Sequence, residues 1–240
     1  QPVTVAIVGA ATAVHATGMV PGLANDPRAP LAVVGIPVTL PLSEIVARLN
    51  AARPALLVGY ATVLAQLGQE RSAGRLTIAP RRVTSTSETL TPELRRLIRN
   101  GLGAPVVDSF ACTEGLTGST APDETVFMFN SDVCIVELVD SDNRPTPVGE
   151  ESNKILVTHL VNRAQPLIRY AIEDRFVQRG RAGGYLCATV VGRSEPLLRF
   201  DAVHVHPHVI RSVLLCHEGV IDYQVRQTPR GVRVDVLGDE

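Results

Sequence analysis

The residue types best suited to chemistry gather near the middle of the 240-residue chain, at residues 108–115. The apolar run before this stretch predicts a strand, and the strand ends in an aromatic side chain, a hydroxyl and a carboxylate. Phe110 offers a flat face, Thr113 a hydroxyl that can donate to a phosphate, and Glu114 a carboxylate that can hold a divalent cation. Ligands bind beyond the carboxyl ends of strands in open α/β sheets. The stretch therefore indicates either a binding site or a plain polar turn.

Two other polar segments suit the same chemistry. A strand is predicted to end at Val83, and the hydroxyl-rich loop after it carries Glu88. This loop supplies either turn and capping groups or a ring of donors for a phosphate or an adenine. Asp174 lies in the charged segment 172–175, which by its residues alone indicates a charged turn with a local ion pair.

Composition argues against several classes of protein. The net charge is −1 and 45% of the residues are hydrophobic, so we expect a soluble globular protein that binds neither nucleic acid nor an anionic membrane through bulk charge. No apolar run reaches the roughly 20 residues of a membrane span. The N-terminus lacks the basic region of a signal peptide and opens directly into an apolar run without a methionine, which predicts a chain cut inside a fold.

Cysteines and histidines limit the metal sites and the location that can be expected. The four cysteines are far apart, which argues against a disulfide framework or a zinc knuckle and predicts reduced thiols in the cytoplasm. His204 and His206 alternate in a predicted strand and share a face, so with His208 and His217 they form an alternative candidate metal site. No cysteine or carboxylate is spaced to complete a metal site with these histidines, so we favour a strand without a metal here.

Strands and helices alternate in the first half of the chain. Runs rich in β-branched residues predict three early strands, at residues 3–8, 31–38 and 56–60. One helix is expected to follow Ser43 as its N-cap, a second covers 62–69, and a third follows Thr91 as N-cap with Pro92 in its first turn. Residues 116–121 are small and are expected to form a loop. This alternation predicts a mostly parallel sheet with crossover helices.

Short strands separated by turns dominate from residue 126 onward. They are predicted at 126–130, 132–139, 154–160, 167–171 and 176–178. After residue 192 we expect a strand at 203–206, a helix at 207–215 and paired strands at 220–225 and 232–237. The predicted fold class is α/β: a mostly parallel sheet with flanking helices, a small antiparallel β-barrel subdomain, and the start of a small α+β domain. The expected boundaries are 1–121, 122–191 and 192–240.

Four motifs occur together in residues 55–210. They are Ser85-Thr86-Ser87-Glu88-Thr89-Leu90, Ser109-Phe110-Ala111-Cys112-Thr113-Glu114-Gly115, the segment from Asn162-Arg163 through Arg169-Tyr170 to Asp174, and Gly192-Arg193-Ser194-Glu195. They resemble, in order, the Gly-Gly-Glu-x-Leu loop, the aromatic-Gly-x-Thr-Glu signature, the Arg-Tyr-x-x-x-Asp segment and the Gly-Arg-x-Asp hinge of the adenylate-forming superfamily. Within it, the chain most resembles the phenylacetate–coenzyme A ligase branch.

The resemblance implies a site for ATP or AMP, with Mg²⁺ and coenzyme A as further cofactors. Phe110 would lie against the adenine, beside Ala111, which stands where the family has a glycine. Thr113 would donate to the α-phosphate, and Glu114 would be the metal ligand. These two residues would be the catalytic pair, because they would stabilise negative charge on the phosphate.

Further roles follow from the same resemblance. Asp174 would accept both ribose hydroxyls, with Arg193 near the ribose. Ser87 and Glu88 would line the nucleotide or acyl pocket, after Ser85 and Thr86 in place of the usual glycines. The remaining expected site residues are Glu195, as the hinge about which the C-terminal domain turns, and His15, near a small carboxylic acid substrate.

The implied function is ATP-dependent activation of a carboxylate through an acyl-adenylate, with transfer to coenzyme A. The family's phosphate loop and its C-terminal catalytic lysine have no counterpart, since Lys154 is the only lysine and falls in the predicted barrel. We therefore expect the full-length parent to be an acid–thiol ligase and this chain alone to be inactive. The alternative is an impaired relative that only binds a nucleotide or serves as a scaffold. The resemblance leaves a homodimer open.

Overall fold

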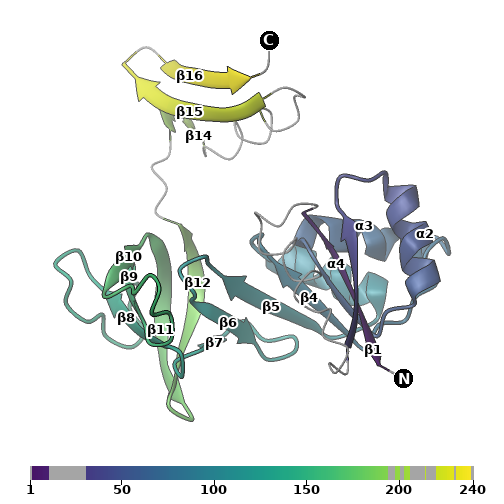
Figure 1. Cartoon of the computed structure of the whole chain (residues 1–240), viewed down its shortest axis with the longest axis horizontal. Helices are drawn as coiled ribbons and strands as arrows, with labels where there is room; N and C mark the ends of the chain where they lie inside the picture. Colours follow the sequence, from purple (N-terminus) through teal and green to yellow (C-terminus); the bar gives the residue numbers. More distant parts are fainter. Residues whose placement is uncertain are drawn as a thin grey trace. The chain divides into compact units, whose positions relative to one another are not determined.

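The computed structural model describes residues 2–10, 31–193, 198–200, 203–205, 214, 220–229 and 231–238. The chain divides into two compact units, Gln1–Gly192 and Arg193–Glu240, and each is described by itself (Figure 1). The expected division at residue 121 falls within the first unit and stays a prediction. None of the helices in the described residues is long and apolar enough to cross a membrane.

A nine-stranded sheet organises the first unit, in the order β11-β12-β7-β6-β5-β4-β3-β1-β2. Its parallel half consists of β1 (Val3–Gly9), β2 (Leu31–Pro37), β3 (Leu56–Gly59), β4 (Arg82–Thr86) and β5 (Val106–Ala111). The predicted early strands and the α/β class are thereby confirmed. One detail is wrong: β4 continues past Val83 to Thr86, because Ser85 and Thr86 pair with Asp108 and Ser109 of β5.

Three described helices connect these strands: α2 (Leu42–Ala52), α3 (Ala61–Ser72) and α4 (Pro92–Leu102). Their apolar faces form one core with the parallel strands. Thr91 caps α4 as predicted, since its hydroxyl accepts the Leu94 N–H at 3.2 Å. Ser43 is not an N-cap, because α2 starts at Leu42, directly after Pro41. In α4, Gly101 lies so close to α3 that a Cβ there would be 2.5 Å from the Gly68 Cα.

Antiparallel strands complete the sheet and form the second core. They are β6 (Thr117–Thr120), β7 (Phe127–Phe129), β11 (Asp174–Ala182) and β12 (Tyr185–Arg193). A separate three-stranded sheet contains β8 (Cys134–Val139), β9 (Lys154–His159) and β10 (Tyr170–Ile172). Apolar residues of both sheets share one cluster around Phe129 and Phe176. The loop predicted at 116–121 is wrong, since β6 pairs with both β5 and β7.

The second unit contains two described strand pairs. β13 (Leu198–Phe200) runs antiparallel to β14 (Val203–Val205), and β15 (Val220–Thr228) runs antiparallel to β16 (Gly231–Gly238). The prediction of paired strands near the end of the chain is confirmed. The helix predicted at 207–215 lies outside the described residues, except for Leu214.

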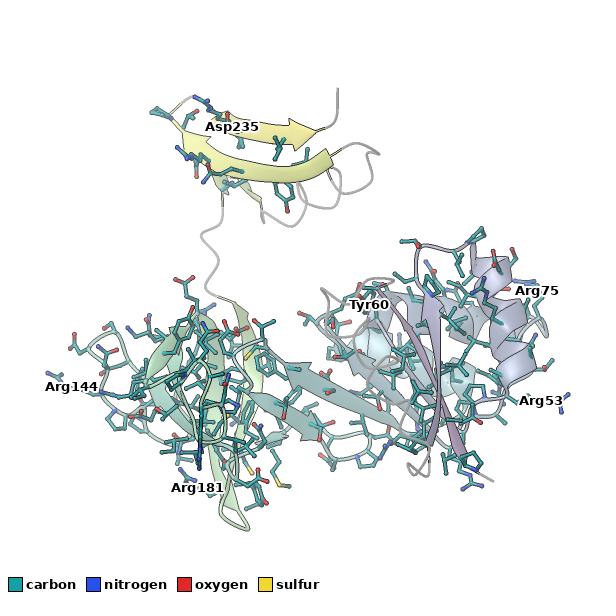
Figure 2. The ribbon with its side chains drawn as sticks, viewed as in Figure 1. Arg53, Tyr60, Arg75, Arg144, Arg181 and Asp235 are labelled. Atoms are coloured by element: carbon teal, nitrogen blue, oxygen red, sulfur yellow. The ribbon has the colours of Figure 1, made fainter. Side chains whose placement is uncertain are left out.

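Arginine supplies nearly all of the positive charge, and several of its side chains reach into solvent. Figure 2 labels Arg53, Arg75, Arg144 and Arg181, all of which are exposed. Arg75 pairs with Glu70, an exposed contact that raises the pKa of Arg75 and lowers that of Glu70 through their hydrogen bond. Such exposed pairs contribute little to stability.

Candidate functional site

The carboxyl ends of β4 and β5 lie side by side. In the parallel register Thr86 pairs with Ser109, so the loop after β4 begins next to Phe110. Ser87 in that loop has a positive φ of 65°, an unusual value for a residue other than glycine. The Glu88 carboxylate accepts hydrogen bonds from the N–H and the hydroxyl of Thr62, both at 2.9 Å. These bonds hold Glu88 at the N-terminus of α3, where a negative charge is favourable.

An aromatic cluster joins β5 to the second core. The Phe110 ring meets Phe129 edge to face at 6.1 Å between centroids and Phe176 at 5.4 Å. Asp174 precedes Phe176 by two residues in β11, and alternation along a strand puts both side chains on one face. Asp174 is 7% exposed. The segment that carries Asp174 is thus brought next to the strand end that carries Phe110, although 62 residues lie between Ala111 and Asp174 in the sequence.

A tight turn follows β5. The Cys112 N–H donates to the Leu116 carbonyl at 3.0 Å, and the Gly115 N–H donates to the Cys112 carbonyl at 3.1 Å. Gly115 has a φ of +88°, which favours glycine. The Thr113 hydroxyl donates to the Glu114 carboxylate at 3.2 Å. The turn therefore places the predicted phosphate donor and the predicted metal ligand next to each other.

Two residues that sequence reasoning missed hold this turn from the other side. The Asn130 side-chain amide donates to the Gly115 carbonyl at 3.2 Å and accepts the Thr117 N–H at 2.9 Å. The Cys134 thiol also donates to the Gly115 carbonyl, at 3.4 Å. No local pattern signals these roles, because Asn130 follows β7 and Cys134 begins β8, and both contacts arise only in the folded chain.

Buried polar groups lie under the same strand ends. Burial raises the pKa of Asp108 to about 6, against the opposing effects of the Arg95 charge and a hydrogen bond from the Ser109 N–H. Ser85, its neighbour across the register, is fully buried, and its hydroxyl has no hydrogen-bond partner in the described part of the chain. Burial also raises the pKa of the Cys112 thiol to about 12. Cys112 is therefore an unreactive thiol at neutral pH.

Several predicted site residues lie outside what the structure describes. His15 and Glu195 are among them, and Arg193 is described only as the last residue of β12, without its side chain. The candidate histidine metal site also falls there, apart from the backbone of His204 in β14. Within the described residues, no group of three or more His, Cys, Asp or Glu side chains could hold a metal ion.

The local ion pair expected within the segment 172–175 is not the one that Arg175 forms. Arg175 pairs with Glu151, which lies outside this segment.

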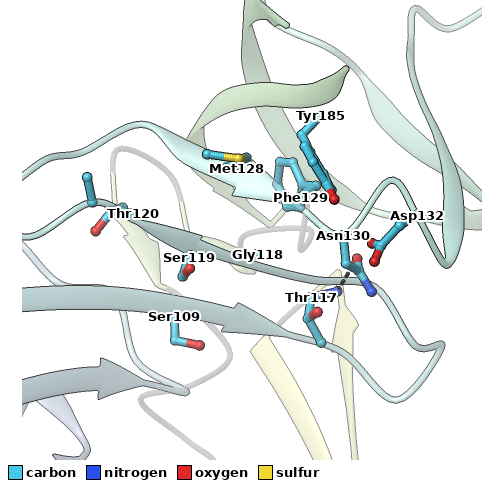
Figure 3. A pocket seen from close by; sticks show the side chains of 11 residues that line it. Ser109, Thr117, Gly118, Ser119, Thr120, Met128, Phe129, Asn130, Asp132 and Tyr185 are labelled. Atoms are coloured by element: carbon cyan, nitrogen blue, oxygen red, sulfur yellow. Dashed lines mark hydrogen bonds between the residues drawn. The ribbon is translucent and has the colours of Figure 1, made fainter. Parts of the chain in front are cut away.

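An open cavity of about 480 Å³ lies across β5, β6 and β7 (Figure 3). Hydroxyl groups of Ser109, Thr117 and Ser119 line it, with Met128 and Tyr185 at the other side. Ser109 and Phe110 are adjacent in one strand, so their side chains point to opposite faces of the sheet. This cavity is therefore distinct from the corner formed by Phe110, the β5–β6 turn and Asp174, and the sequence did not predict it.

Comparison with known proteins identifies solved structures that have a similar fold. No family model matches the chain. It is 27% identical over 210 residues to chalcone synthase cfoA of Aspergillus candidus. The similar region covers 75% of this chain and 7% of that protein. Among solved structures it is similar to 2-hydroxyisobutyryl-CoA ligase in complex with 2-HIB-AMP, with a TM-score of 0.70 and 18% identity over 99% of this chain and 55% of that one.

Two further solved structures are similar. A benzoate CoA ligase from Burkholderia xenovorans LB400 has a TM-score of 0.61 at 21% identity, covering 98% of this chain and 50% of that one. MbtA of Mycobacterium smegmatis has a TM-score of 0.58 at 15% identity, covering 100% of this chain and 48% of that one. The chain spans about half the length of these solved structures. We conclude that the chain has the α/β fold of these solved structures.

Proposed function

We propose that the chain carries the nucleotide corner of an enzyme that activates a carboxylic acid as an acyl-adenylate. One observation carries the proposal: the fold joins Phe110, the turn with Thr113 and Glu114, and the segment of Asp174 at the carboxyl end of β5. An aromatic face, a hydroxyl, a metal-binding carboxylate and a diol-binding carboxylate together suit a nucleotide. Similar folds bind such intermediates, namely 2-HIB-AMP and anthranoyl-AMP in two of the ligases.

In the proposed reaction a carboxylate oxygen attacks the α-phosphorus of ATP and pyrophosphate leaves. Phe110 stacks against the adenine and Asp174 accepts the ribose hydroxyls. Thr113 donates to an α-phosphate oxygen, where negative charge builds during the attack. Mg²⁺ in proteins is commonly held by one or two carboxylates together with substrate phosphates, so Glu114 as its single protein ligand fits. When bound, Mg²⁺ would neutralise phosphate charge.

The finer assignments extend the same proposal. We place Ser87, Glu88 and Ala111 beside the nucleotide, and Arg193, Glu195 and His15 in the roles that the family resemblance implies. The acceptor is coenzyme A, and the acid is a small carboxylic acid such as an aromatic acid of the phenylacetate type. The parent enzyme works in the cytoplasm, and the proposal allows it to act as a homodimer.

A second candidate is a nucleotide-binding relative without turnover. It is favoured by the position of Lys154, the only lysine of the chain. Lys154 begins β9, whereas His159 at the opposite end of that strand reaches the β5–β6 turn. A strand of this length spans about 17 Å, so the lysine lies far from the proposed phosphate corner.

Mg²⁺-dependent ATP binding tests the proposal. Calorimetric titration of the chain with ATP is expected to show one site whose affinity rises about tenfold or more when Mg²⁺ is added, because the ion joins Glu114 to the phosphates. Glu114→Gln should abolish the rise, while Glu150→Gln, at an exposed glutamate before β9, should keep it. Absence of ATP binding, or an undiminished Mg²⁺ effect in Glu114→Gln, would contradict the proposal.

A further inference from the structure

His159 lies against the turn that carries Thr113 and Glu114. It is the last residue of β9, and its half-buried side chain faces Gly115. A Cβ built on Gly115 would be 2.5 Å from His159 Nε2 and would also overlap Cδ2. The ring edge that contains Nε2 is therefore the edge nearest the turn, and Gly115 leaves the space for it.

Hydrogen bonds at the other ring nitrogen determine the tautomer of the neutral His159 ring. Its Nδ1 accepts the Asn162 N–H at 2.8 Å and the Val161 N–H at 3.2 Å. A ring nitrogen that accepts carries no proton, so the proton of the neutral imidazole is on Nε2. Within the described residues, this Nε2–H has no hydrogen-bond acceptor. The two backbone donors thus orient the ring and leave one N–H group directed toward the turn.

We infer that His159 binds the nucleotide phosphate, with its Nε2–H donating to a phosphate oxygen held at the β5–β6 turn. The inference rests on the proposed function and adds a residue to it that the motifs do not include. A donor fixed before the ligand arrives is favourable, because little ordering remains to be done on binding. The ring also packs on Gly115 and so keeps the turn in place beside the same oxygen.

Three matched variants separate donation from support of the turn. His159→Asn keeps an acceptor near Nδ1 for the two backbone N–H groups but loses the Nε2 donor. His159→Gln places an amide N–H close to the position of Nε2. His159→Phe keeps the ring against Gly115 but has neither nitrogen.

Titration with AMP and with adenosine gives the decisive comparison. His159→Asn and His159→Phe are expected to weaken AMP binding by about tenfold, while adenosine binding stays unchanged and His159→Gln retains most of the AMP affinity. Equal losses for AMP and adenosine would show a structural role, and an unchanged AMP affinity in His159→Asn would exclude donation. Either result overturns the inference.

Nitrogen NMR of the histidine rings tests the inference separately from the proposed function. The signals missing from His159→Asn identify His159, and its Nδ1 should be unprotonated and its Nε2 protonated in the free protein. Inorganic pyrophosphate should shift the Nε2 signal and leave Nδ1 in place. If the chain bound no nucleotide, the proposed function would fail, and the pyrophosphate shift would still test whether His159 binds a phosphate. No shift, or a proton on Nδ1, overturns the inference.

Discussion

Replacing Asp174 with asparagine is expected to weaken AMP binding by about a hundredfold. The proposed role of the carboxylate is to accept both ribose hydroxyls, and hydrogen bonds to a charged group contribute more than neutral ones. Asparagine has nearly the same shape, but it is uncharged and one of its two polar atoms is a donor. It therefore cannot accept from both hydroxyls, and affinity for 2′,3′-dideoxy-AMP should change much less than affinity for AMP.

Glu173→Gln is the matched control for Asp174→Asn. Glu173 is exposed and adjacent in sequence, and it lies between β10 and β11. It should leave AMP affinity within about twofold, since exposed charges that make no contact contribute little. Because Asp174 is buried, thermal unfolding of each variant must show that the fold persists. A folded Asp174→Asn protein with wild-type AMP affinity would exclude the ribose role.

Replacing Asp108 with asparagine is expected to stabilise the protein at pH 8 by about 1–2 kcal/mol. Burial raises the pKa of Asp108 from 3.8 to about 6, so the ionised form is less favourable in the folded chain than in the unfolded one. The full shift corresponds to about 3 kcal/mol, and we halve it because the side chain is only half-buried. Asparagine keeps an acceptor for the Ser109 N–H and carries no charge.

The pH dependence of this effect has a definite sign. Between pH 3.8 and about 6 the folded state binds more protons than the unfolded state at Asp108, so its contribution to stability falls as the pH rises. The advantage of Asp108→Asn should thus be fully present above pH 6 and vanish below about pH 4. Urea unfolding at several pH values measures it. An advantage that is the same at pH 4 and pH 8 would exclude the buried carboxylate as its cause.

Asp142→Asn serves as the control for these stability measurements. Its side chain is 64% exposed and pairs with Arg144 in the turn after β8. The free energy of unfolding is expected to change by at most about 0.5 kcal/mol. A larger change would mean that removing any carboxylate affects this protein, and the assignment of the effect to Asp108 would fail.

Elements with strong local signals were predictable from the sequence. The β-branched runs of β1 and β2 are buried parallel strands, and Thr91 and Pro92 mark the start of α4 because capping depends on neighbouring residues. Strand β6 was missed because its sequence, Thr-Gly-Ser-Thr, has no apolar alternation. It becomes a strand through pairing with β5 and β7, which no local pattern reports.

Only some residues of the candidate site could be predicted from the sequence. Phe110, Thr113 and Glu114 could be singled out because they follow one predicted strand. Their surroundings could not, since Thr62 on Glu88 and His159 against Gly115 are contacts between segments far apart in the sequence. The hydroxyl-rich loop that was expected to begin after Val83 is instead partly strand, and Ser85 is buried within that strand.

Binding of a non-hydrolysable acyl-adenylate tests the central proposal most directly. Adenosine 5′-sulfamate acylated with benzoate reproduces the adenine, the ribose and the mixed-anhydride linkage of the intermediate. Calorimetry of the chain is expected to show one site that binds it at least about tenfold more tightly than AMP, because stable mimics of a bound intermediate engage both the nucleotide and the acyl contacts. The absence of saturable binding, or an affinity no better than that of adenosine, would contradict the proposal.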